Sequence, residues 1–211
     1  SKKMFLIVSI MIALSLVLSA CGEKVDEGTV FKVGFLGPYS GPSAQTGKQF
    51  KGGIEMALEE FDYQIGPYTI EPVWVDSQSD PAKASQAYEQ AVVQDGIQAG
   101  AVNWHSSVAV AVMEVTAKHQ IPHIFGFGAT EVVNETFESD RDKYGYWSTK
   151  GWPTPAKLGY KYVDALDYYE GEGVYAPANK IAAIYGEDTD WGRSFGGQMK
   201  EAFEAAGWEV V

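Results

Sequence analysis

Cysteine, histidine and basic residues are scarce in this sequence. Its 211 residues include a single cysteine, Cys21, so no disulfide can form within the chain. Of the three histidines, His119 and His123 are four positions apart, but Pro122 separates a predicted helix end from a predicted strand, which disfavours a zinc site. The formal net charge is -12, and no basic residues cluster to neutralise phosphates. This balance argues against a nucleic-acid partner.

Motifs for cofactors and for catalysis are also missing. The glycines Gly34, Gly37 and Gly41 do not have the G-x-G-x-x-G spacing of a dinucleotide site, and no phosphate-binding loop with its lysine follows them. In a nucleophile elbow the serine is the third residue of G-x-S-x-G, whereas Ser40 comes one place later. We therefore expect no cofactor, no metal and no catalytic residue. A hydrolase that uses Ser106 or Ser40 is the less favoured alternative.

The first twenty residues have the pattern of an export signal. Two lysines precede the apolar run 4–18, and small residues lead up to Cys21. The segment Leu18-Ser19-Ala20-Cys21 resembles a bacterial lipobox. That resemblance implies cleavage after residue 20, lipidation of Cys21, a tether over residues 21–29 and an extracytoplasmic protein anchored to the bacterial membrane. A plain signal peptide with an incidental cysteine is the alternative.

Strand and helix patterns alternate along residues 30–143. Apolar runs predict strands, and periodic apolar positions predict helices between them. Asp80 and Pro81 are typical of a helix start, and Gly96 of its end. The predicted elements are strands over 30–36, 68–75, 97–102 and 121–127, with helices starting near 44–46, at 81 and after Ser107. This order predicts an α/β fold with a parallel sheet and helices on both faces.

The sequence pattern over residues 144–211 predicts a second, smaller unit. Helices are expected over 155–169 and from Asp190 onward, with strands at 180–185 and at 210–211. Two strands and two helices make an incomplete lobe, and a chain ending at the start of a strand suggests part of a longer protein. We expect such a chain to leave an uncovered sheet edge.

The loops after the predicted strands are the candidate binding site. In an open parallel sheet, ligands lie at the carboxyl ends of the strands. Ser106 and Ser107 stand where a strand ends and a helix begins, so they offer an N-cap hydroxyl and free backbone N–H groups at the positive end of the helix. Such a position holds a carboxylate or another small polar group. Trp104 and Trp191 adjoin two of these loops and could grip the body of a ligand.

An ordered set of motifs resembles the Leu/Ile/Val-type substrate-binding lipoproteins of ABC transporters. The motifs are the lipobox, Val33-Gly34-Phe35-Leu36-Gly37-Pro38-Tyr39-Ser40-Gly41, Gly47 to Gly53, Asp76-Ser77-Gln78-Ser79-Asp80-Pro81, His105-Ser106-Ser107, Phe127-Gly128-Ala129-Thr130 and Tyr185 to Gly192. They cover essentially the whole chain after Cys21.

The resemblance implies a two-lobed, type I periplasmic-binding fold that closes on a solute and passes it to a membrane permease. It implies that Ser106, Ser107, Ala129 and Thr130 hold the carboxylate of an amino acid, amide or related solute. Thr46 stands where the family often has an aromatic residue that covers the ligand, and Trp191 where it commonly has tyrosine. The residues expected at the ligand are Ser106, Ser107, Ala129, Thr130, Trp104, His105, Gly128, Thr46 and Trp191. A sensor of the same fold that feeds a regulatory system is the alternative.

Overall fold

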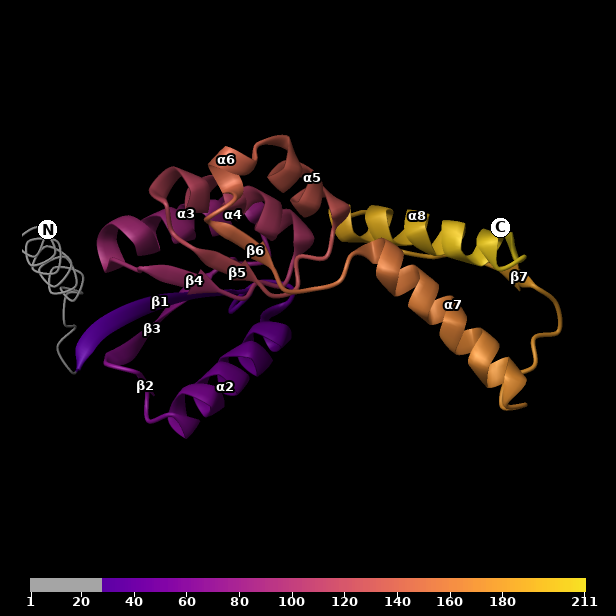
Figure 1. Cartoon of the computed structure of the whole chain (residues 1–211), viewed down its shortest axis with the longest axis horizontal. Coiled ribbons are helices and arrows are strands. Elements are labelled where there is room, and N and C mark those ends of the chain that lie inside the picture. The colour runs from indigo at the N-terminus through magenta and orange to yellow at the C-terminus, as the bar shows by residue number, and fades with distance from the viewer. Residues whose placement is uncertain (1–27) are drawn as a thin grey trace, which may run out of the picture.

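The computed structural model describes residues 28–211 (Figure 1). The predicted signal over 1–20, the predicted lipidation site at Cys21 and most of the predicted tether over 21–29 lie outside the described residues. Within 28–211, no helix has the length and apolar character that a membrane crossing requires.

A six-stranded sheet forms the centre of the first unit. Its spatial order is β2 (Gln64–Ile65), β3 (Tyr68–Asp76), β1 (Thr29–Gly37), β4 (Ala99–Ala101), β5 (His123–Phe125) and β6 (Ser148–Lys150). Only the short edge pairing of β2 with β3 is antiparallel, and the other neighbours are parallel. β1 pairs with β3 on one side and with β4 on the other, so the order of the strands reverses at β1. Ligands of open α/β sheets bind at such a reversal.

Helices cover both faces of this sheet, as the sequence predicts. Helix α2 (Ala44–Glu60) lies on one face, and α3 (Pro81–Gln90), α4 (Ser106–His119), α5 (Glu131–Ser139) and α6 (Arg141–Tyr144) lie on the other (Figure 1). The predicted caps of α3 are confirmed. The Asp80 carboxylate accepts a hydrogen bond from the Lys83 N–H at 2.9 Å. A π-helical turn, η1 (Ala91–Asp95), extends α3 and ends at Gly96 in a left-handed conformation.

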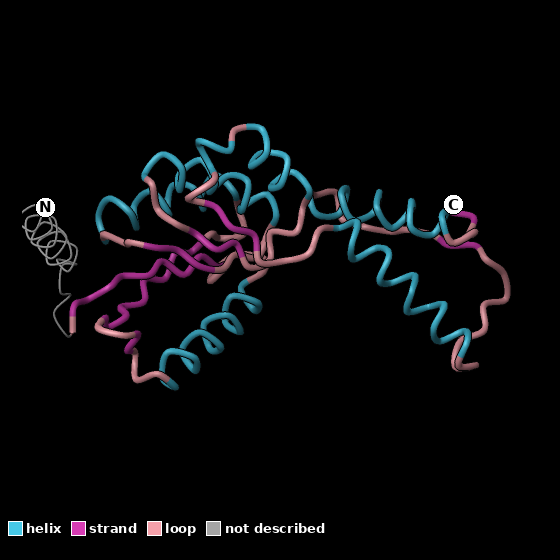
Figure 2. Tube along the Cα trace, in the orientation of Figure 1, coloured by secondary structure: helices cyan, strands magenta, loops and turns pink. Residues whose placement is uncertain are grey.

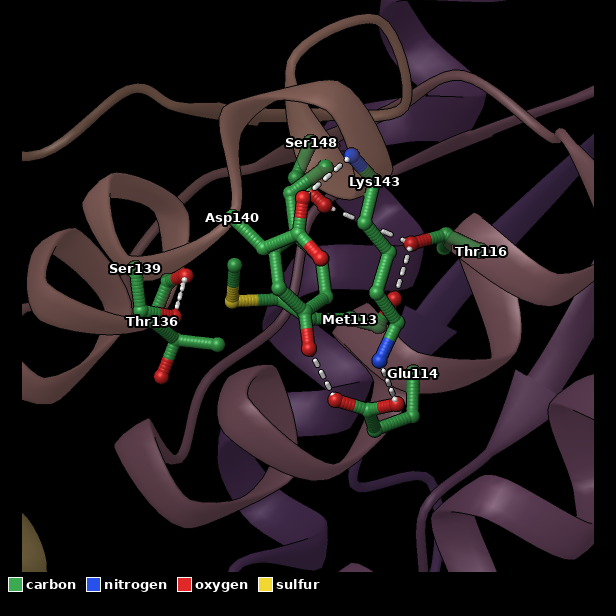
Figure 3. Close-up of polar contacts among 9 residues, drawn as sticks. Met113, Glu114, Thr116, Thr136, Ser139, Asp140, Lys143 and Ser148 are labelled. Atoms are coloured by element: carbon green, nitrogen blue, oxygen red, sulfur yellow. Dashed lines mark hydrogen bonds and ion pairs between the residues drawn. The ribbon is translucent and has the colours of Figure 1, made fainter.

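Side-chain contacts attach residues 140–150 to α4 (Figure 3). Lys143 Nζ donates to Glu114 at 2.7 Å, and the hydroxyls of Thr116 and Ser148 are 3.4 Å apart. β6 pairs with β5 in parallel, although it lies beyond residue 143, where the first lobe is predicted to end. The first sheet therefore continues to Lys150, while the division into lobes over 30–143 and 144–211 stays a prediction.

The second unit holds two helices and two short strands, in agreement with the sequence pattern. Its elements are α7 (Pro155–Gly171), β7 (Ile181–Ala182), α8 (Asp190–Ala205) and β8 (Glu209–Val210). The parallel strands β7 and β8 form a separate sheet beside α8 (Figure 2). Val163, Ala202, Phe203 and Trp208 form its small core. The fold is thus a mixed α/β structure with two units, of which the second is the smaller.

A buried histidine joins the first sheet to the helices above it. The His123 Nδ1 atom lies 2.8 Å from the Tyr88 hydroxyl, and Nε2 lies 2.8 Å from the carbonyl oxygen of Val102. The geometry fits a neutral ring that donates from Nε2 to the carbonyl and accepts from Tyr88. Gly100 makes room for the pair, because a Cβ atom there would lie 2.1 Å from both side chains. Burial lowers the pKa of His123 to about 4.

Acidification is expected to destabilise the fold through His123. The unfolded chain binds a proton near pH 6.5 and the native His123 only near pH 4, so stability is lost as the pH falls through this window. The loss from this residue alone should reach about 3 kcal/mol by pH 4. Denaturant unfolding between pH 7 and 4 should show a shallower decline in His123→Gln than in the wild type. His119→Gln is the comparison, at a partly exposed histidine that contacts Glu89, and a slope in His123→Gln equal to that of the wild type would contradict this assignment.

Candidate functional site

A cavity of about 620 Å³ lies at the carboxyl ends of the first sheet. Its wall is made of loops that follow β1, β3, β4, β5 and β6, together with the segment between β7 and α8. The lining residues are Pro42, Ser43, Ser79, Trp104, His105, Ser106, Ser107, Phe127, Ala129, Trp152, Glu187, Thr189 and Trp191. The cavity therefore joins residues of the first sheet to residues of the second unit.

The start of α4 forms one end of this cavity. His105 has the extended backbone of an N-cap residue, and Ser106 is the first helical residue. The expectation that a serine side chain caps α4 is therefore wrong, since no side chain at this position makes a cap hydrogen bond. The first N–H groups of a helix lack partners within the helix and carry its positive end. Ser106 and Ser107 line the cavity at this end, so a polar group or an anion of a solute can meet backbone donors there.

Asn103 connects the loop after β4 to the loop after β5. Its side chain is fully buried. Its Oδ1 accepts from the N–H groups of Phe127 and Gly128, both at 3.3 Å, and its Nδ2 donates to the His105 carbonyl at 3.1 Å. A Cβ atom on Gly128 would lie 2.5 Å from that of Ala109 in α4, so the loop needs glycine there. Gly128 supports the loop and does not line the cavity.

The loop of Ala129 and Thr130 is fixed from both sides. Ala129 lines the cavity, but Thr130 is fully buried, and its hydroxyl caps α5 by accepting from the Val132 N–H at 3.3 Å. The Thr130 N–H donates to the Ser106 hydroxyl at 3.3 Å. Lys150 Nζ donates to the carbonyl oxygens of Ala129 at 2.9 Å and Thr130 at 3.1 Å. Thr130 and Lys150 thus position the loop rather than line the cavity.

Aromatic rings form the apolar part of the wall. Phe127 lies between Trp104 and Trp152, with ring centroids 5.6 and 4.7 Å away. Trp191 stacks on Phe195 at 4.7 Å and faces the cavity from the second unit. Thr46 lies in the first turn of α2 and is not part of the cavity wall. The apolar part of the wall therefore contains the predicted Trp104 and Trp191. It also contains Phe127 and Trp152, which were not among the predicted ligand contacts.

The hydrogen-bond partners of His105 are relevant to the alternative that the protein is a hydrolase. Its Nε2 lies 3.0 Å from the Ser43 hydroxyl, a separation suited to a nucleophile and a base. A third group must orient the other ring nitrogen, yet Nδ1 is buried and has no hydrogen-bond partner among the described residues. Burial lowers the pKa of His105, and the charge of Glu187 partly opposes that change. Ser40 contacts Asp76 at 2.6 Å, and neither it nor Ser106 contacts a histidine in the part of the chain that the structure describes.

Several residues that line the cavity were not predicted from the sequence. Ser43, Ser79 and Phe127 belong to loops that the sequence analysis names as the candidate binding site. The position of each loop at the end of a strand is the sequence feature that could have identified these residues. Trp152 and Glu187 reach the cavity from the end of β6 and from the second unit, and no local pattern indicates it. Among residues 28–211, no group of three or more metal-ligating side chains occurs.

Comparisons with known proteins agree with this architecture. A family model described as "Periplasmic binding protein" matches residues 30–211. The chain is 33% identical over 185 residues to a Leu/Ile/Val-binding protein homolog of Brucella abortus, which covers 86% of this chain and 43% of that protein. The chain thus spans less than half the length of the curated relatives it matches.

Solved structures show the same fold. A solute-binding protein of an ABC transporter from Rhodopseudomonas palustris, in complex with p-hydroxybenzoic acid, is 26% identical and has a TM-score of 0.69; the match covers 86% of this chain and 45% of that one. A leucine-binding protein from Thermotoga maritima has a TM-score of 0.70 at 17% identity, and the match covers 86% and 47%.

Loss of the Asn103 side chain is expected to loosen both loops. Asn103→Ala removes the partners of two N–H groups and one carbonyl in a buried setting, so the free energy of unfolding should fall by roughly 1–3 kcal/mol. Denaturant unfolding measures this change. Asn179→Ala, at an exposed position in the loop before β7, is the matched control and should change stability little. A similarly small effect at Asn103 would show that the loops do not depend on it.

Proposed function

Because this chain belongs to the periplasmic binding protein family, we propose that it captures a small solute between its two units and delivers it to an ABC transporter permease. The proposed solutes are amino acids, amides and related carboxylates. One observation carries the proposal: the 620 Å³ cavity is lined both by loops at the carboxyl ends of the first sheet and by Glu187, Thr189 and Trp191 of the second unit. A solute held there would contact both units at once.

The two ends of a solute would meet different chemistry in this cavity. A carboxylate or another polar head fits the start of α4, where Ser106 and Ser107 offer hydroxyls and backbone N–H donors. An apolar body fits the rings of Trp104, Phe127 and Trp191. We assign Thr130 and Gly128 to the support of the loop, and Trp104, His105, Ser106, Ser107, Ala129 and Trp191 to contact with the solute.

Closure of the two units would give the solute-bound protein a different shape from the free protein. A ligand that contacts both units stabilises the closed arrangement over the open one. The closed form is then the state that a permease distinguishes. An extracytoplasmic site of action agrees with the family, and we propose that lipidated Cys21 anchors the protein to the membrane.

A ligand panel tests the proposed function. The full-length protein is mixed with amino acids, amides and small carboxylates, and unfolding is followed by thermal shift. A ligand at a hundred times its dissociation constant should add about 2.7 kcal/mol to the stability of the native state. Ser107→Ala is expected to weaken a positive response, because Ser107 lines the cavity beside the start of α4.

The control for this panel is Ser85→Ala, which removes a hydroxyl that donates to the Pro81 carbonyl in α3. It should leave the response unchanged. A flat response from a well-folded full-length protein across the whole panel would overturn the proposed solute classes.

A further inference from the structure

We propose that His123 is a positioning residue for solute binding, because it holds Val102 in the backbone conformation that sets the course of the loop leading into α4. The lining residues of the cavity include neither His123 nor Val102. His123 would therefore influence how tightly a solute is held without touching it. This role rests on the proposed function and deepens it.

Val102 has an unusual backbone conformation. It directly follows β4, and its φ angle of 59° lies in the left-handed region. Among residues 28–211 it is the one β-branched residue with a positive φ. Steric contacts between a branched side chain and the backbone disfavour this region, so valine keeps it only where the surrounding structure imposes it. The conformation of Val102 therefore depends on the groups that hold it.

Hydrogen bonds to both backbone groups of Val102 impose this conformation. Its N–H donates to the carbonyl of Ile124 at 2.9 Å, next to the pairing of β4 with β5. Its carbonyl oxygen accepts from His123 Nε2 at 2.8 Å. The first bond joins two backbone groups and forms with any side chain at residue 124. The second comes from a side chain, so it depends on the histidine.

The imidazole ring of His123 is itself fixed in place. It is buried, and its Nδ1 atom lies 2.8 Å from the Tyr88 hydroxyl. The ring also packs on that of Phe125, with centroids 4.2 Å apart. A donor held on several sides defines the direction in which the Val102 carbonyl points.

The conformation of Val102 determines the position of the loop after β4. Rotation about its φ angle redirects every atom that follows, beginning with Asn103. Asn103 would then lose its hydrogen bonds to the N–H groups of Phe127 and Gly128, each 3.3 Å long. The start of α4 would move relative to the loop after β5. His123 thus acts on the cavity through Val102 and Asn103.

Two substitutions of His123 separate positioning from packing. The amide oxygen of asparagine can accept from Tyr88 at the place of Nδ1, but asparagine is too short to donate from the place of Nε2. The longer glutamine reaches the place of Nε2 with its amide and can donate to the Val102 carbonyl. Both variants lose the ring and one of two buried hydrogen bonds, so both should be less stable than the wild type. Only His123→Asn should release Val102.

Hydrogen exchange and calorimetry of the full-length protein supply the readouts. Exchange is followed by mass spectrometry in peptides that cover residues 103–109, with peptides of α8 as the internal reference. Affinities at pH 7 are measured for L-phenylalanine, 2-phenylacetamide and phenylacetate, one probe from each proposed class of solute. The control is His119→Asn, the same chemical change at a histidine that contacts Glu89 and does not line the cavity.

His123→Asn is expected to weaken the affinity for each probe that the wild type binds by about tenfold, and to speed exchange over 103–109 by a similar factor relative to α8. His123→Gln and His119→Asn should stay within about threefold of the wild type. Adding Val102→Gly to His123→Asn should restore much of the loss, because glycine adopts a positive φ without steric cost. If His123 had only a packing role, the second substitution would add to the damage.

Equal losses in His123→Asn and His123→Gln would assign the ring a packing role and overturn the proposal. Wild-type exchange and affinity in His123→Asn would overturn it too, as would a double variant no better than His123→Asn. If the folded wild type binds none of the three probes, the proposed solute classes fall. The exchange rates over 103–109 then still decide whether His123 positions the loop.

Discussion

The buried amide of Asn103 is the constraint on which the site depends. Loops at the ends of parallel strands are exposed to solvent and seldom hold a fixed shape without added contacts. Asn103 accepts two hydrogen bonds from the loop after β5, and it donates a third to the His105 carbonyl within its own loop after β4. Because these bonds are shielded from water, their loss would leave buried backbone groups without partners. The start of α4 and the segment through Ala129 are therefore held as one surface.

Buried polar groups extend this support beneath the loops. His123 and Tyr88 form a neutral hydrogen-bonded pair below β4, and Lys150 binds the backbone of Ala129 and Thr130 from β6. Desolvation lowers the pKa of Lys150, whose ammonium is held by carbonyl and amide oxygens. The loops face the cavity with groups that already have defined positions. Such preorganisation reduces the conformational entropy that the loops would lose when a solute binds.

Local patterns predicted the elements of the fold well because their signals lie within a few residues. Asp80, Pro81 and Gly96 mark the bounds of one helix with its π-helical extension. The serine cap of α4 was wrong because His105 takes the N-cap conformation one residue earlier. The pairing of β6 with β5 gives no periodic signal in so short a segment, so the place of β6 in the first sheet comes from the tertiary structure.

The sequence by itself determined the alternating order of strands and helices, the family, and the loops in which a site would lie. Each of these follows from residue patterns and from the rule that parallel strands end at one edge of a sheet. Only the tertiary structure decided which side chains of those loops face the cavity. It turned Thr130 inward as a cap, left Thr46 outside the wall, and brought Trp152 and Glu187 into the same cavity wall as Ser107. Those placements depend on sheet order and on the approach of the two units, which join residues far apart in the chain.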